Sequence, residues 1–164
     1  MIHVPRHVVI VGGTAGRDEA RSYVAEYTSI WCVARIYNKV PYADLVFDMH
    51  NNPQHWDPQT YRAHRDGKLV VQKPIDEFPK AGILPTEIMQ QEFGTPFTSS
   101  FSWMTAVAIH GNAQMISLLG VNMQHKTEKG LQRDGLMYLL GFAKARGIRI
   151  NTTQLSALKQ GVRI

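Results

Sequence analysis

The chain has 164 residues, of which 44% are hydrophobic and 19% are charged, and this composition is typical of a globular protein rather than a disordered one. No stretch reaches the roughly 18 consecutive apolar residues of a membrane span. The first residues also lack the apolar run of a signal peptide, so we expect a cytoplasmic protein without membrane contacts. The net charge of +5 comes from scattered basic residues, which suits an anionic small molecule and makes nucleic acid the weaker expectation.

Short, continuous apolar runs predict the strands of a buried sheet. The first run, at 7–11, ends at two glycines, and similar runs lie at 30–34, 44–48 and 115–121. Such runs are typical of strands that are buried on both faces, as in parallel sheets. We therefore expect these four segments to be neighbouring, mainly parallel strands of one sheet. Cys32, the only cysteine, lies in the second run, which predicts a buried structural thiol and excludes an intramolecular disulfide.

Helical segments alternate with these strands. Expected helices span residues 17–27, 58–66, 85–93, 100–110 and 127–146, with further strands at 69–71 and 148–150. Asp57 is the expected cap of the helix at 58–66, and the segment Thr98-Ser99-Ser100 can cap the helix that runs to His110. Four prolines between 74 and 98 predict mostly loop there. The alternation predicts one α/β domain over residues 1–164, a three-layer Rossmann-like sandwich with a mainly parallel sheet.

In such sheets, ligands bind outside the carboxyl ends of the strands. The glycine-rich segment 12–16 follows the first strand, where glycine allows close backbone approach to a phosphate and Thr14 adds a hydroxyl donor. The segment matches neither the P-loop nor the full dinucleotide-binding pattern. A tight strand-to-helix turn without a ligand is the alternative interpretation.

Asp48 and His50 end the third strand, two positions apart, so in an extended chain they point to the same side. A carboxylate beside an imidazole suits acid–base catalysis or a single metal ion. The metal interpretation is weak because no other ligand types cluster nearby, and we predict no metal site. A solvated strand end is the alternative.

The first residues of two predicted helices are further candidates for binding an anionic ligand. Capping explains at least one of Ser99 and Ser100, while the helix dipole also makes this a potential anion site. Arg133 begins the long helix and suits a phosphate or carboxylate, although a solvated helix face or an ion pair near Asp134 explains it equally. We predict that Arg133 converges with Asp48 and His50 on one cleft. The predicted catalytic residues are Asp48 and His50, and the predicted ligand-binding residues are Gly12, Gly13, Thr14, Asn51, Ser99, Ser100, Asn122 and Arg133.

Four segments, at 8–13, 43–50, 98–104 and 119–123, together with the helix that contains Arg133, carry a family resemblance. With them, the chain resembles small phage-encoded Rossmann-like proteins of the 6-hydroxymethylpterin pyrophosphokinase-like and motility-associated glycosyltransferase-like family. The resemblance implies a nucleotide or other phosphorylated ligand at the sheet edge, in a transferase-like site. Asn122 stands where an acidic residue is common in that family, which argues against metal-assisted transfer.

These observations lead to a nucleotide-binding or nucleotide-sugar-binding protein of phage origin, transferase-like if active, with no cofactor assigned. The alternative is a catalytically silent phage protein that binds and inhibits a host protein. A nucleic-acid accessory role is the third hypothesis and has only the net charge in its favour. The sequence is compatible with a homo-oligomer, and it names neither a substrate nor a host partner.

Overall fold

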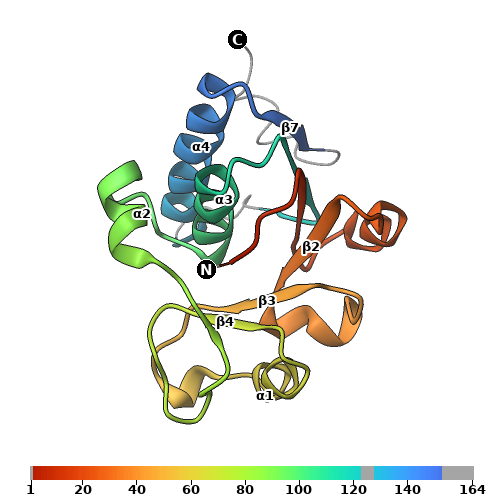
Figure 1. Ribbon diagram of the computed structural model, residues 1–164, viewed down its shortest axis with the longest axis vertical. Helices are drawn as coiled ribbons and strands as arrows, with labels where there is room; N and C mark the ends of the chain where they lie inside the picture. The colour runs from red at the N-terminus through yellow and green to blue at the C-terminus, as the bar shows by residue number, and fades with distance from the viewer. Residues whose placement is uncertain (1, 123–127, 153–164) are drawn as a thin grey trace.

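The computed structural model (Figure 1) describes residues 2–122 and 128–152. Within these residues seven strands form one sheet in the order β5-β4-β3-β2-β1-β6-β7, and every neighbouring pair is parallel. The predicted Rossmann-like α/β fold is thereby confirmed, as is the pairing of its four main strands. The strands are β1 (His7–Val11), β2 (Thr28–Val33), β3 (Leu45–Asp48), β4 (Leu69–Val71), β5 (Gly82–Ile83), β6 (Met115–Leu119) and β7 (Arg149–Thr152).

Helices cover both faces of the sheet. The helices α2, α3 and α4 lie on one face, while α1 lies beyond the other (Figure 1). None of the helices in the described part of the chain has the length and apolar character that a membrane span requires. The α-helices are α1 (Pro58–Arg65), α2 (Thr86–Phe93), α3 (Ser100–His110) and α4 (Glu128–Ala145), and the 3-10 helices are η1 (Arg17–Tyr23), η2 (Ala34–Lys39) and η3 (Pro53–His55).

Strand β1 separates two hydrophobic cores, because successive side chains of a strand point to opposite faces. Val8 and Ile10 pack in the core that α3 and α4 cover. Val9 and Val11 pack in the other core, against residues of η2 and α1. All four side chains are fully buried, which accounts for the continuous apolar run in the sequence.

Two local predictions differ from the structure. The expected helix at 17–27 is only the 3-10 helix η1, because Ala20 is its one buried residue and no apolar stripe holds a longer helix against the sheet. The segment at 34–39 forms η2, and β5 adds a two-residue strand within the predicted loop. Asp57 caps α1 as predicted, and Ser99 is the one of the three candidate residues that caps α3: both side chains accept hydrogen bonds from the backbone of their helices.

The order of the strands sets the position of a functional site. From β1 the chain proceeds through β2, β3, β4 and β5 toward one edge, and β6 and β7 then extend the sheet on the other side of β1. The connections after β1 and after β6 therefore leave in opposite directions. In open parallel sheets such a switch point leaves a crevice at the carboxyl ends of the strands.

The Cys32 thiol is fully buried in β2, as predicted, and burial raises its pKa to about 12. Because the thiolate is the reactive form, we expect no labelling of the native protein by a disulfide reagent such as DTNB at pH 8. In guanidinium chloride the same thiol should react fully within minutes. Fast stoichiometric labelling of the folded protein would contradict this placement of Cys32.

Candidate active site

Two cavities meet at the carboxyl edge of the sheet, and together they form what we call the cleft. The larger one has a volume of about 670 Å³ and the smaller one about 310 Å³. Residues at the ends of β2 and β3 and at the start of α3 and α4 line both. The shared lining residues are Val33, His50, Ser100, Phe101 and Gln132.

Asp48 is the anchor of the cleft. This side chain is only 4% exposed, and each of its carboxylate oxygens is hydrogen-bonded. Oδ1 accepts the backbone N–H of His50 at 3.0 Å and lies 2.7 Å from its ring nitrogen Nδ1. Oδ2 accepts the hydroxyl of Thr60, a fully buried residue of α1, at 2.6 Å. Helix α1 thus holds the carboxylate in place behind the end of β3.

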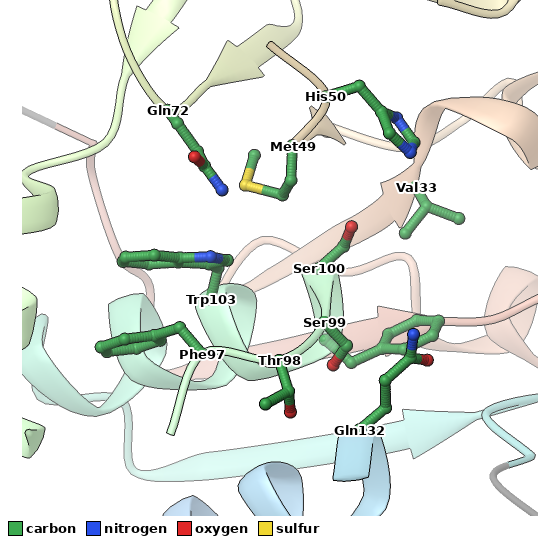
Figure 2. A pocket seen from close by; sticks show the side chains of 11 residues that line it. Val33, Met49, His50, Gln72, Phe97, Thr98, Ser99, Ser100, Trp103 and Gln132 are labelled. Atoms are coloured by element: carbon green, nitrogen blue, oxygen red, sulfur yellow. The ribbon is translucent and has the colours of Figure 1, made fainter. Parts of the chain in front are cut away.

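The imidazole of His50 is held by Asp48 and is half-exposed in the cleft. Because a carboxylate only accepts hydrogen bonds, Nδ1 carries a proton, and in the neutral ring Nε2 then has the lone pair. The indole of Trp56 donates to the carbonyl of His50 at 3.0 Å, which fixes the backbone as well. An imidazole oriented in this way suits general-base catalysis at Nε2. Figure 2 shows the His50 ring and the Ser100 hydroxyl directed into the same space.

The glycine-rich turn after β1 has a structural role that the sequence alone does not reveal. A Cβ atom on Gly12 would overlap the carbonyl oxygen of Gly120 and lie 2.8 Å from its carbonyl carbon. The Thr14 hydroxyl donates to the same carbonyl oxygen at 2.6 Å. The predicted donor of Thr14 is therefore directed at the protein, although Thr14 and Gly13 both line the large cavity.

Ser99 and Ser100 have different roles at the start of α3. The Ser99 oxygen accepts the backbone N–H of Ser102 at 3.2 Å, so this residue is the helix cap. Ser100 lines both cavities. Helix α3 therefore directs its amino-terminal end, the positive end of its dipole, toward the cleft.

Of the other predicted residues, some line the cleft and some do not. Asn122 lines the large cavity. Asn51 lines neither cavity but donates from Nδ2 to the Gln72 side chain, which lines the small one, at 3.2 Å. Arg133 lines neither cavity, and its guanidinium lies 3.6 Å from the carboxylate of Asp134. Its neighbour Gln132 is the residue of α4 that lines both cavities. Asp48 and His50 therefore share the large cavity, and Arg133 does not line it.

Sequence reasoning missed several cleft residues. Arg35 and Lys39 of η2 bring two exposed cations to the large cavity, which His55 and Trp56 also line. Arg35 lies two residues after the end of β2, and this place at a strand end was the available signal for it. Among the residues that the structure describes, no group of three or more His, Cys, Asp or Glu side chains is placed to hold a metal ion.

Neither a protein-family model nor a curated protein matches the chain. Among solved structures, the chain is similar to the sialyltransferase CstII from Campylobacter jejuni in complex with a substrate analogue, CMP-3FNeuAc. That match has a TM-score of 0.51 and 15% identity, and it covers 96% of this chain and 84% of that chain. A structure of the sialyltransferase CST-II in complex with a trisaccharide acceptor and CMP matches with a TM-score of 0.48 and 15% identity, over 92% of this chain and 83% of that chain. The chain shares the Rossmann-like fold of the first of these proteins.

Proposed function

We propose that the chain binds a nucleotide sugar in the cleft and transfers the sugar to a hydroxyl group of an acceptor. The observation that carries this proposal is the imidazole of His50, which Asp48 orients between two cavities at the carboxyl edge of the sheet. The fold adds support, since a similar fold in CstII accommodates a CMP-linked substrate analogue.

The large cavity suits the nucleotide. Arg35 and Lys39, which are positively charged at neutral pH, offer charge-assisted hydrogen bonds to a phosphate. The planar guanidinium of Arg35 can bind two phosphate oxygens at once. The amino-terminal end of α3 adds the positive end of a helix dipole. Asp48 and Asp57 also line this cavity, and their carboxylates balance the formal charge of the two cations. Both carboxylates accept hydrogen bonds from the protein, from Thr60 and His50 in the first case and from the backbone N–H of Gln59 in the second. The exposed Arg35 and Lys39 have no such partners in the lining and are the groups we assign to the phosphate.

In the proposed reaction, Nε2 of His50 takes the proton of the acceptor hydroxyl. The acceptor oxygen then forms a bond to the anomeric carbon of the sugar, while the bond from that carbon to the phosphate oxygen breaks. The electron pair of the broken bond leaves with the nucleotide, whose developing charge Arg35 and Lys39 stabilise. Asp48 stabilises the imidazolium that forms on His50.

The test is calorimetric titration of the protein with CMP, UDP, GDP and ADP, followed by the corresponding nucleotide sugars. We expect at least one nucleotide to bind, and we expect Arg35→Gln and Lys39→Gln each to weaken its binding about 10-fold or more through loss of a charge-assisted hydrogen bond. The matched control is Arg65→Gln, since Arg65 is an exposed residue of α1 that lines neither cavity. Equal losses in the control would point to net charge rather than to a site.

A panel in which no nucleotide binds would overturn the proposal. That result would favour the alternative function, a catalytically silent protein that binds a host protein. The phage origin implied by the family resemblance stays a prediction.

A further inference from the structure

The two halves of the cleft differ in the number of ionisable side chains that line them. The large cavity is lined by Arg35, Lys39, Asp48, His55 and Asp57, and none of these residues lines the small one. Apart from the shared His50, the described residues that line the small cavity carry no ionisable side chain. Its polar groups are the hydroxyls of Thr98, Ser99 and Ser100, the amides of Gln72 and Gln132, and the indole of Trp103. A neutral partner fits this lining better than a charged one.

An aromatic pair forms one wall of the small cavity. Phe97 and Trp103 stack with their ring centroids 3.8 Å apart and their planes at 11°. Figure 2 shows the two rings lying one above the other, with Met49 and Gln72 across the cavity from them. Aromatic surface beside amide and hydroxyl groups is the combination that a sugar ring requires, because a sugar has apolar C–H faces and polar hydroxyl edges.

Trp103 carries a polar group that the protein itself does not use. The side chain is only 6% exposed, and its indole N–H makes no hydrogen bond to any residue in the described ranges 2–122 and 128–152. The indole nitrogen is not itself among the fully buried polar atoms, so water or a ligand can reach this donor. An indole N–H in such a position normally pairs with one or the other. This donor lines the small cavity, where an acceptor oxygen of a ligand can satisfy it.

Gln72 offers a second donor from the opposite side. Its carbonyl oxygen accepts from Asn51, so the orientation of the amide is set and its NH₂ group remains for a ligand. From these contacts we infer that the small cavity is the acceptor subsite and that the acceptor is a neutral, hydroxyl-rich sugar whose hydroxyls bind Trp103 and Gln72 beside His50. This inference rests on the proposed function, because it assigns the large cavity to the nucleotide.

The test compares neutral and anionic sugars as probes. Saturation-transfer NMR would follow methyl β-galactoside, methyl β-glucoside and lactose, with glucuronate and galacturonate as anionic counterparts, in the presence and absence of CMP. We expect a neutral probe to bind, and Trp103→Phe to weaken that binding about 5- to 10-fold, since this substitution keeps an aromatic ring next to Phe97 but removes the N–H donor together with part of the ring surface. Nucleotide affinity should stay unchanged.

Because Trp103 is buried, its variant requires a check of folding by thermal melting, and Gln72→Leu provides a second variant at a more accessible position. The matched control is Gln114→Leu, an exposed glutamine that lines neither cavity. The inference is overturned if anionic sugars bind better than neutral ones, or if Trp103→Phe and Gln72→Leu both bind the neutral probe as the wild type does. If neutral sugars bind through Trp103 and no nucleotide binds, the subsite stands and the proposed function fails.

Discussion

Replacing Gly12 with alanine is expected to destabilise the folded protein by about 3 kcal/mol or more, because the added methyl group meets backbone and not a movable side chain. The carbonyl group of Gly120 occupies the space that the methyl group needs. That carbonyl is itself held by the N–H and the hydroxyl of Thr14, at 3.0 and 2.6 Å. Relief of the clash therefore requires β1 and β6 to separate at the centre of the sheet. Chemical unfolding followed by circular dichroism measures the loss.

Gly141→Ala is the matched control for this substitution. Gly141 lies in α4, and a Cβ atom there would meet nothing within 4 Å. Alanine favours a helix interior over glycine by about 0.5 to 1 kcal/mol, so this variant should be slightly more stable than the wild type. A Gly12→Ala protein as stable as Gly141→Ala would show that the two strand ends do not approach each other as described.

Replacing Asp48 with alanine is expected to lower the proposed sugar transfer about 100-fold or more, because His50 then loses both its orientation and the charge that stabilises its protonated form. The change should also lower stability by about 2 kcal/mol, since the fully buried hydroxyl of Thr60 loses its acceptor. Transfer assays at saturating nucleotide sugar and urea unfolding measure the two effects separately. Nucleotide affinity should not fall, because the change removes a negative charge from the lining of the large cavity and leaves Arg35 and Lys39 in place.

Thr60→Val separates the two roles of Asp48. It removes the hydrogen bond to Oδ2 and leaves the contact between Oδ1 and His50 in place. We expect it to reduce stability by about 1 kcal/mol while transfer falls only a few-fold. Equal losses of transfer in Thr60→Val and Asp48→Ala would show that the contact between Oδ1 and His50 does not account for the loss, and would contradict the proposed role of Asp48.

The strands were predictable because a strand that is buried on both faces consists of a continuous run of apolar residues. The continuous runs of β1, β2, β3 and β6 reflect neighbouring strands and helices on either side. Elements without such a mark were missed: β5 is two residues long, and η2 follows β2 without a break in the sequence pattern. In η1, polar residues and a single buried alanine gave a helical pattern without the apolar stripe that stabilises an α-helix.

The site was partly predictable for a similar reason. Asp48 and His50 follow a strand end, and in a parallel sheet every strand end faces the same edge. Which residue of α4 faces that edge is a different question, because successive helix positions are turned about 100° apart. Gln132 and Arg133 differ by one such step, and only the first lines the cleft. Trp103 is buried, as its apolar surroundings predict, yet one edge of its ring also reaches a cavity.

The pairing of β1 between β2 and β6 also constrains how the protein folds. His7 pairs with Met115, so the central strand of the sheet has only one neighbour until most of the chain has been synthesised. Contacts between segments this distant in sequence form slowly, because the loop between them must be ordered first. During synthesis the apolar strand β1 is thus left with one open side, which makes the unfinished chain a potential client for chaperones. The carboxyl ends of β1 and β6, where Gly12 contacts Gly120, can come together only after β6 has been synthesised.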